Sequence, residues 1–439
     1  MKGEPLMLEE IVAEREKIDR TDRKLAELFG ERMMTVKRIA ELKSASGKPV
    51  FDPGREKAML EKELEYVDPE MRKYYRRVLS CLLECSKAYQ SEIVSSENTL
   101  TVSVNGGSYN ITVKRGGVEA VGDIFKLDRR VLVVTDSGVP GEYAEAVAAR
   151  CAEPTVITLP EGEKTKSLES FATLEKAMLD GGFDRNDCVA AVGGGVVGDL
   201  TGFAAATYLR GIDYVQIPTS LLAQVDSSVG GKTAIDISAG KNLVGAFKQP
   251  KLVIADTDTL KTLSDDFFTD GMGEVVKYGM IYSKSLFDTL KSGNIRSDPE
   301  AVIAQCIDIK REVVEADEFD TGLRMILNFG HTLGHAIEKY YNYTGISHGK
   351  AVAIGMYLIT KTAENNGLIE KNISGELKEC LTANGLPFET EIDGASLFAG
   401  AVNDKKRFSD TINIILCKEI GKAEIVKLNI TDLRNMLEK

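Results

Sequence analysis

The sequence predicts a multidomain protein with an all-α N-terminal segment, an α/β domain built on a parallel sheet, and a mainly α-helical domain. Glycine marks the first boundary, because residues 1–97 hold four glycines and the remaining chain holds 36. After residue 98, short β-branched runs alternate with helical stretches, which is typical of parallel α/β sheets. From about residue 257 the pattern becomes mainly helical. We therefore expect domains at 1–95, 99–256 and 257–439, with a linker at 96–98.

Composition excludes several other classes of protein. Of the 439 residues, 43% are hydrophobic and 28% are charged, which is ordinary for a globular chain. The 55 basic and 67 acidic residues give a net charge of −12, which argues against a general nucleic-acid binder. No apolar run approaches the ~20 residues of a membrane span, and no secretory signal pattern begins the chain. Seven scattered cysteines without a C-x-x-C pair predict a cytoplasmic location and no disulfide framework.

Three helices are expected in the N-terminal segment, with no strand between them. The first runs from about Leu6 to Lys43 and ends in a Ser- and Gly-containing stretch. The second follows Asp52 and Pro53, which suit the N-cap and the first helical position. The third begins near Asp68 and continues to about Val94.

Strands are expected next. A hairpin of Thr99–Val104 and Tyr109–Val113 should begin the α/β domain, because Asn105 and two glycines lie between these runs. Five more β-branched runs predict a parallel sheet, whose ligands bind at the C-terminal strand edges. A second hairpin, Thr411–Cys417 with Ala423–Leu428, is expected late in the helical domain. The five runs are Val131–Thr135, Thr155–Leu159, Cys188–Val192, Tyr214–Ile217 and Leu252–Ala255.

The first helix carries three cations on its apolar stripe. Arg15, Arg32 and Lys43 occupy positions of a heptad pattern that otherwise contains Ile, Leu, Phe and Val. Such a stripe should face a core, where an unpaired cation is costly. A single cation there ordinarily snorkels or pairs with a carboxylate, but three on one seam favour an anion site. Arg15 and Arg32 lie roughly 25 Å apart along a helix, so either two sites exist or a second copy of the chain supplies Arg15.

Two glycine-rich segments suggest phosphate chemistry. Gly193, Gly195 and Gly198 follow a predicted strand, where backbone N–H groups can approach a diphosphate, although a plain tight turn explains them equally well. The segment ending in Lys232 looks like the end of a Walker A loop, but Asp226 stands where the first glycine is required. A nucleotide site and a phosphorylated substrate are therefore expected, without ATP hydrolysis.

All three histidines of the chain lie between residues 331 and 348. His331 and His335 are four residues apart, so spacing alone predicts that both bind zinc from one helix face. Glu274 is a candidate third ligand. Three protein ligands with an open position would make a catalytic zinc site.

The first segment resembles the all-helical class of chorismate mutase over nearly its whole length. The resemblance implies an intertwined helical dimer in which Arg15 enters the partner's site, and conversion of chorismate to prephenate. That rearrangement needs a compact conformer and charge stabilisation, without a nucleophile or a metal. Arginines would hold the substrate carboxylates, while Lys43 and Gln90 would face the ether oxygen. The eight matching positions are Arg15, Arg32, Lys43, Asp52, Arg55, Glu56, Ser86 and Gln90.

Residues 99–439 resemble 3-dehydroquinate synthase in long, nearly continuous motifs. This resemblance implies a Rossmann-like NAD-binding domain at 99–256 and a metal- and substrate-binding helical domain at 257–439. It places zinc or cobalt on Glu274, His331 and His348, so that His335 becomes a substrate-side residue. The motifs are Gly193–Gly211, Pro218–Lys232, Gly240–Phe247, Gly273–Gly279 and Leu327–Glu338.

The same resemblance assigns cofactor and substrate contacts, and Lys232 belongs to both sets. The cofactor contacts are Glu163, Lys166, Gly195, Gly198, Asp199, Thr219, Ser220, Lys232, Lys241, Thr259 and Thr262. The substrate contacts are Arg210, Asp226, Lys232, Asn242, Lys277, Lys310, Arg324, Asn328 and His335, with either Lys405 or Lys406.

Three departures from the family pattern stand near the metal ligands. Ser264-Asp265-Asp266-Phe267 replaces the usual Pro-x-Arg-Glu. Lys350 replaces the Glu that usually follows His-Gly, and Gly273 replaces the Ala before the metal Glu. None of them removes a ligand or a substrate contact, so they affect local packing and the surroundings of the ligands.

The resemblance implies that 3-deoxy-D-arabino-heptulosonate 7-phosphate is converted to 3-dehydroquinate and phosphate. NAD would be reduced and then regenerated, so no net oxidation is expected. One alternative is a metal- and NAD-dependent alcohol dehydrogenase, and another is a different sugar-phosphate cyclase. A third makes the helical segment a dimerisation module that senses prephenate or chorismate. Only small-molecule substrates and a second copy of the chain are expected as partners, with no nucleic acid and no membrane.

Overall fold

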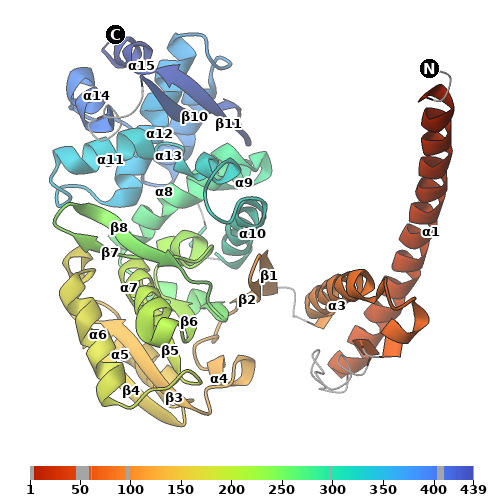
Figure 1. Ribbon diagram of the computed structural model, residues 1–439. Helices are drawn as coiled ribbons and strands as arrows, with labels where there is room; N and C mark the ends of the chain where they lie inside the picture. Colours follow the sequence, from red (N-terminus) through yellow and green to blue (C-terminus); the bar gives the residue numbers. More distant parts are fainter. Residues whose placement is uncertain are drawn as a thin grey trace. The chain divides into compact units, whose positions relative to one another are not determined.

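The computed structural model describes residues 4–45, 59–60, 62–94, 99–291, 293, 295–296, 299–402 and 410–438 (Figure 1). The chain divides into two compact units, Met1–Thr101 and Val102–Lys439. The predicted linker at 96–98 lies outside the described residues. No helix in the described ranges is long and apolar enough to cross a membrane.

The first unit is built from two long helices, α1 (Glu4–Ala45) and α3 (Arg72–Val94), and a short 3₁₀ helix at Leu64–Tyr66. Figure 1 shows α3 lying beside one part of α1. The third helix begins later than expected, because the carbonyl of Asp68 accepts a hydrogen bond from the N–H of Met71 in a turn that precedes it. The predicted start of the second helix at Asp52 and Pro53 lies outside the described residues.

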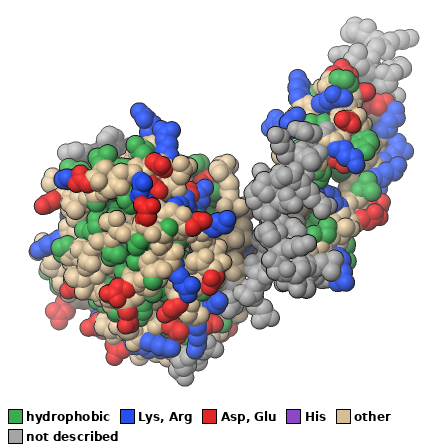
Figure 2. All heavy atoms as spheres, turned by 90° about the horizontal axis from the view of Figure 1, so that it is seen from below, with side chains coloured by type: hydrophobic (Ala, Val, Ile, Leu, Met, Phe, Trp, Pro, Cys, Tyr) green, Lys and Arg blue, Asp and Glu red, His purple; other side chains and the backbone are tan. Residues whose placement is uncertain are grey.

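The apolar stripe of α1 does not face a core within one chain. Ile11, Ile18 and Leu25 are 46%, 58% and 55% exposed, whereas Val36 is buried. The cause is length, because α1 has 42 residues and α3 has 23, so α3 covers only part of the stripe. Figure 2 shows hydrophobic side chains among charged ones on the surface of this unit. The expectation of a core along the whole stripe is therefore wrong for the isolated chain.

The second unit begins with a seven-stranded sheet in the order β1-β2-β9-β6-β5-β3-β4. The strands from β2 to β4 in this order pair in parallel, which confirms the predicted parallel α/β sheet. Valine is the most frequent residue of the central strands β3 and β5, whose side chains are buried on both faces. The bounds are β1 Thr99–Val104, β2 Gly107–Val113, β3 Arg130–Asp136, β4 Glu153–Leu159, β5 Cys188–Gly193, β6 Asp213–Pro218 and β9 Leu252–Ala255.

Helices cover both faces of this sheet. One face packs on α6 (Leu168–Asp180) and α7 (Gly195–Thr207), through side chains such as Leu174 and Leu200. The other face packs on the short helices α4 (Val121–Ile124) and α5 (Gly141–Ala148). The result is a layered α/β domain with α7 beginning directly after the C-terminal end of β5.

Sequence analysis missed one hairpin in this domain. Strands β7 (Lys232–Ile237) and β8 (Gly240–Phe247) pair antiparallel in a separate two-stranded sheet. The two glycines before Lys232 favoured a phosphate-binding loop at the start of β7 instead. The hairpin carries Lys232 and Asn242 on a regular element rather than on a loop.

The remainder of the second unit is mainly helical, as predicted, with the expected late hairpin. Helix α8 is buried almost continuously from Asp270 to Ile281 and forms the centre of this domain. The helices are α8 Asp265–Ile281, α9 Lys284–Leu290, α10 Glu300–Ala316, α11 His331–Tyr340, α12 His348–Asn365, α13 Ile373–Ala383, α14 Gly394–Val402 and α15 Ile430–Leu437, and the hairpin is β10 Thr411–Glu419 with β11 Lys422–Asn429.

Two glycines let α8 and α12 approach very closely. A Cβ added at Gly349 would lie 1.8 Å from the carbonyl oxygen of Asp270, and one at Gly273 would lie 2.4 Å from the carbonyl oxygen of Gly349. Gly273, which replaces alanine of the family pattern, is therefore part of a backbone-to-backbone contact between the two helices. This contact brings the start of α12 beside the middle of α8.

Candidate active site

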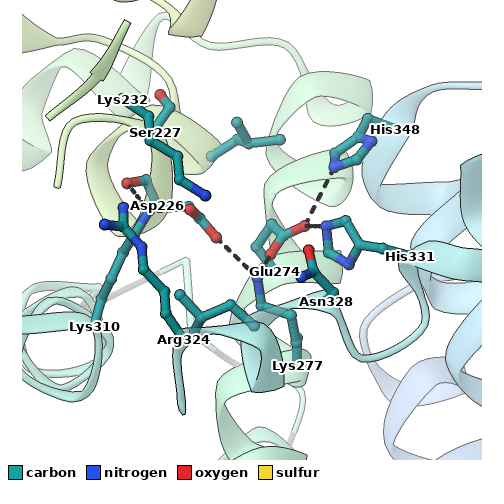
Figure 3. Close-up of a pocket in the computed structure, with 12 residues that line it drawn as sticks. Asp226, Ser227, Lys232, Glu274, Lys277, Lys310, Arg324, Asn328, His331 and His348 are labelled. Carbon is teal, nitrogen blue, oxygen red and sulfur yellow. Dashed lines mark hydrogen bonds and ion pairs between the residues drawn. The ribbon is translucent and has the colours of Figure 1, made fainter. Parts of the chain in front are cut away.

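A cavity of about 210 Å³ lies where the α/β domain meets the helical domain. Its charged lining comprises four cationic and two acidic side chains, which suits an anionic ligand. The labelled side chains in Figure 3 come from elements far apart in sequence and point toward one space. The lining residues are Leu222, Asp226, Ser227, Lys232, Glu274, Lys277, Lys310, Arg324, Leu327, Asn328, His331 and His348.

Asp226 links two of the cations. It lies in a π-helical turn, Ala223–Ser227. The Nζ of Lys277 lies 2.9 Å from its Oδ2, and Lys310 forms an ion pair with Oδ1 (Figure 3). Although burial alone would raise it, Lys277 and Lys310 hold the pKa of Asp226 well below its usual value. The hydroxyl of Tyr278, a residue that sequence reasoning missed, donates to the same carboxylate at 3.0 Å.

Lys310 and Arg324 are two further buried cations of the cavity wall, besides Lys277. Burial lowers the pKa of Lys310 to about 8, against the opposing effect of Asp226. Arg324 is 2% exposed and donates to the carbonyl of Gly230 at 3.2 Å. Gly230 has φ +95°, and a Cβ there would lie 2.4 Å from the guanidinium. The segment that resembled a Walker A loop is thus a turn that admits Arg324.

Glu274, His331 and His348 form a group of possible metal ligands. Their donor atoms lie within 4.8 Å of one another, and Nε2 of each histidine is 3.5 Å from Oε1 of Glu274 (Figure 3). Glu274 is 2% exposed, its Oε2 forms an ion pair with Lys277, and its Oε1 faces the two imidazoles. A buried carboxylate of this kind fits a cation beside two imidazoles.

The second nitrogen of each imidazole in this group already has a partner. Nδ1 of His331 lies 3.1 Å from the carbonyl oxygen of Phe329, and Nδ1 of His348 lies 3.4 Å from Oε2 of Glu338. Burial also lowers the pKa of His331 to about 3, so that its ring is neutral. Burial acts to lower the pKa of His348, but the carboxylates of Glu274 and Glu338 raise it to about 10. Both rings therefore direct Nε2 toward Glu274, and His348 would release a proton on binding a cation.

The pair chosen by spacing is disfavoured. Among the described residues, a second possible ligand group consists of His335, Glu338 and His348, and His331 shares no group with His335. The helical i, i+4 rule failed here because His331 is the first residue of α11, so its ring faces the start of α12 as much as its own helix.

Several residues predicted to bind NAD lie close together. The Nζ of Lys166 is 2.5 Å from both Oδ2 of Asp199 and Oδ1 of Asn242. Lys241 lies 3.5 Å from Glu163 in an ion pair. The N-cap residue of α7 is Gly194, which has no side chain to cap the helix, and such a helix start suits an anion such as a diphosphate.

The glycines of the same loop have a packing role. A Cβ at Gly193 would lie 2.7 Å from Val197, and one at Gly198 would lie 2.9 Å from Oε1 of Gln216. Gly195 is less restricted, since Ser227 would be 3.2 Å away. Close packing of α7 against β5 thus accounts for Gly193, and close packing of α7 against β6 accounts for Gly198. Gly195 instead lies beside Ser227 of the cavity lining.

The remaining predicted contacts are distributed around this centre. Thr219 donates its N–H to the carbonyl of Gly193, and the hydroxyl of Ser220 accepts from the N–H of Ala223. Thr259 and Thr262 bond to residues of the surrounding loops. Outside the cavity lining lie Arg210, at φ +68°, Asn242 and His335. Lys405 and Lys406 lie outside the described residues.

Only part of the predicted mutase site is described. Arg32 on α1 donates to the hydroxyl of Ser86 on α3, which brings two predicted site residues together. Arg15 is exposed. The side chains of Lys43 and Gln90, and the whole of Asp52, Arg55 and Glu56, lie outside the described residues.

Two departures from the family pattern contact each other. The Nζ of Lys350 lies 3.0 Å from Oδ1 of Asp266, where the family pattern has Glu and Arg. Position 266 is therefore negative instead of positive, and position 350 is positive instead of negative, so the two side chains still carry opposite charges. Ser264, which replaces proline, caps α8 by accepting from the N–H of Phe267 at 3.3 Å.

These features define a class of two-domain enzymes with a layered α/β domain, a helical domain and a Glu–His–His group between them. Among solved structures, 2-deoxy-scyllo-inosose synthase complexed with carbaglucose-6-phosphate, NAD+ and Co2+ superimposes with TM-score 0.70 and 28% identity, over 78% of this chain and 99% of that one. The 2-epi-5-epi-valiolone synthase of Streptomyces hygroscopicus, with NAD+ and Zn2+ bound, gives 0.69 and 26%, over 76% and 97%. An iron-containing alcohol dehydrogenase, at 15% identity and TM-score 0.52, shares the fold alone.

Sequence comparison narrows this class. The 3-dehydroquinate synthase of Clostridium beijerinckii is 45% identical over 344 residues, 75% of this chain and 98% of that protein. That of Clostridium kluyveri is 43% identical over 350 residues, 77% and 98%. Residues 156–270 and 271–407 match the N-terminal and C-terminal models of 3-dehydroquinate synthase, and residues 14–91 match chorismate mutase type II. The chain belongs to the 3-dehydroquinate synthase family and carries an N-terminal chorismate mutase type II domain, so both resemblances are confirmed.

Proposed function

We propose that the second unit converts 3-deoxy-D-arabino-heptulosonate 7-phosphate to 3-dehydroquinate and phosphate, and that the first unit converts chorismate to prephenate. One observation carries the synthase assignment: the Glu–His–His group opens into a cavity with four cationic side chains. An acid sugar phosphate carries two anionic groups, which this excess of cations matches. The higher identity to 3-dehydroquinate synthases than to the other cyclases favours the quinate-forming reaction.

Within this proposal, Glu274, His331 and His348 hold a divalent zinc or cobalt ion, and the loop before α7 with Lys166 and Asp199 holds NAD. When bound, NAD would accept and return a hydride, while the metal would lower the pKa of the substrate alcohol. Arg324, Asn328 and Lys232 line the cavity and would hold the phosphate. Lys310 is a candidate for the carboxylate.

Within the same proposal, the remaining predicted residues contact either the substrate or NAD. Arg210, Asn242, His335 and Lys406 would complete the substrate contacts. Glu163, Thr219, Ser220, Lys241, Thr259 and Thr262 would complete those to NAD. A cytoplasmic location is proposed from the cysteine content.

The test is phosphate release from the heptulosonate phosphate with catalytic NAD+, before and after chelation, while absorbance of NADH is followed. We expect chelator-sensitive turnover without accumulating NADH. Metal-dependent accumulation of NADH would instead indicate a dehydrogenase. An enzyme that stays inactive after metal is restored, but turns over another heptulose phosphate, would indicate a different cyclase.

For the mutase we propose a homodimer in which Arg15 acts in the partner's site. The exposed apolar residues Ile11, Ile18 and Leu25 support this, because a second copy would bury them. The contact between Arg32 and Ser86 supports a site on the inner part of the helices.

Coexpression of two differently tagged variants, R15A and R32A, tests this arrangement. If Arg15 acts in the partner's site, each mixed dimer contains one intact site, and random pairing of the inactive variants restores about a quarter of wild-type mutase activity. If Arg15 acts within its own chain, no mixed dimer contains an intact site and activity stays at the level of the single variants. Sedimentation of the wild type gives the oligomeric state independently.

A further inference from the structure

His348 is held by two carboxylates that lie outside the proposed ligand set. It is the first residue of α12. Oδ1 of Asp270 accepts hydrogen bonds from the next two backbone N–H groups, those of Gly349 at 2.7 Å and Lys350 at 3.2 Å. Asp270 lies one helical turn before Glu274 on α8, so the helix that bears one ligand also fixes the backbone at another.

Glu338 holds the imidazole itself. It comes from α11, is 6% exposed, and places Oε2 3.4 Å from Nδ1 of His348. Among the described residues, no lysine or arginine forms an ion pair with Glu338. The imidazole of His348 is therefore the partner of this carboxylate. A buried carboxylate in this position costs free energy unless it is hydrogen-bonded, and His348 supplies that bond.

The two imidazoles of the ligand group are thus oriented by different partners. The carbonyl of Phe329 orients His331, whereas an ionised carboxylate orients His348. A carboxylate makes the imidazole a more basic ligand than a carbonyl does, and fixes the proton on Nδ1. The side-chain rotamer and the tautomer of His348 therefore depend on Glu338.

We propose that Glu338 is a positioning residue, which fixes His348 with Nε2 directed at the cation held by Glu274 and His331. This inference rests on the proposed metal site. A competing role exists, because Glu338 also belongs with His335 and His348 to the second possible ligand group. In that case Glu338 would bind the cation directly.

The experiment titrates the metal-free full-length protein with Co2+ and records the visible absorption bands and the dissociation constant. Variants are E338Q and E338A, with E274Q as the ligand variant and E370Q, an exposed residue, as the matched control. We expect E338A to bind Co2+ about 10–100-fold more weakly than the wild type, with bands at unchanged wavelengths. E338Q should lie between the two, because its amide oxygen still accepts from Nδ1 without the charge.

Each other outcome overturns a distinct claim. Unchanged affinity in both variants of Glu338 removes the positioning role. Shifted bands in E338A, with E274Q binding normally, would assign Glu338 to the ligand set instead. Failure of the wild type to bind Co2+ would overturn the proposed metal site as well. Far-UV circular dichroism of the metal-free variants establishes that they are folded, and the nearly isosteric E338Q keeps the test valid if E338A is not.

Discussion

At the scale of single residues, burial and nearby charges act in opposite directions on the pKa values of the cavity side chains. Lys277 and Lys310 both contact Asp226, yet their pKa values move in opposite directions. Burial acts to lower both, but Asp226 and Glu274 together outweigh it at Lys277, while Lys310 has only Asp226 and also faces Arg324. Lys277 therefore stays charged, whereas Lys310 can lose its proton near pH 8.

Lys310 gives a pH-dependence with a defined sign. Its pKa is lowered to about 8, so the side chain loses its proton as pH rises through that value. If the cation binds substrate, kcat/KM of the synthase should fall tenfold per pH unit above about 8. K310R, whose guanidinium stays charged, should move this limb to higher pH even if its activity is lower. An alkaline limb that is identical in K310R would assign it to another group.

At the scale of secondary-structure elements, the contact between α8 and α12 is the most constrained feature. Glycine at position 349 allows the first turn of α12 to lie against the backbone of Asp270. Lys350 and Asp266 then join the same two helices at the surface. The metal-ligand geometry therefore depends on how closely two helices pack.

Substitution of Gly349 measures this packing. G349A should destabilise the second unit by about 1–3 kcal/mol, because the new Cβ overlaps the carbonyl of Asp270. The free energy of unfolding in urea, monitored by circular dichroism, provides the measurement. G106A is the matched control, since nothing lies within 4 Å of a Cβ there. Equal stability of both variants would mean that the helices can separate at no cost.

Substitution can return the ion pair between Asp266 and Lys350 to the charge order of the family pattern. D266R or K350E alone places like charges together and should lower stability, whereas the double variant restores an attraction in the family's own order. Asp266 is 90% exposed, so each effect should be at most about 1 kcal/mol and should shrink in high salt. A double-mutant cycle with zero coupling energy would contradict the pairing.

The comparison of sequence and structure is also instructive at this scale. The β-branched runs from Val131 to Ala255 were recognised because strands of a parallel sheet read as short, nearly continuous β-branched runs separated by helical stretches. The β7–β8 hairpin was missed because its glycines resemble a phosphate loop, and only its antiparallel pairing distinguishes the two. Glu274 could not be joined to His331 and His348 by spacing, since the group forms between the middle of one helix and the first residues of two others.

Whole-molecule behaviour follows from the division into two units. The cavity, the Glu–His–His group and all of the sheet except the first three residues of β1 lie within Val102–Lys439. We expect a protein lacking residues 1–97 to keep synthase activity within about twofold of the full chain and to lose mutase activity completely. Parallel assays of the two reactions measure this. Loss of both activities would mean that the synthase depends on the helical unit.

The same pair of proteins addresses regulation. If the helical unit senses prephenate or chorismate, either ligand should change the synthase rate of the full chain and leave that of the truncated protein unchanged. Equal synthase rates in both proteins at saturating prephenate would mean that the helical unit is a second enzyme on the same chain and does not regulate the synthase.

The positions of the two histidines have an electrical consequence. His331 and His348 are the first residues of α11 and α12, where the aligned peptide dipoles place a partial positive charge. The fields of both helices favour negative charge on an oxygen that arrives between them. Under the proposed function this oxygen would be the substrate alkoxide, and the two helix ends are oriented toward it before any substrate enters.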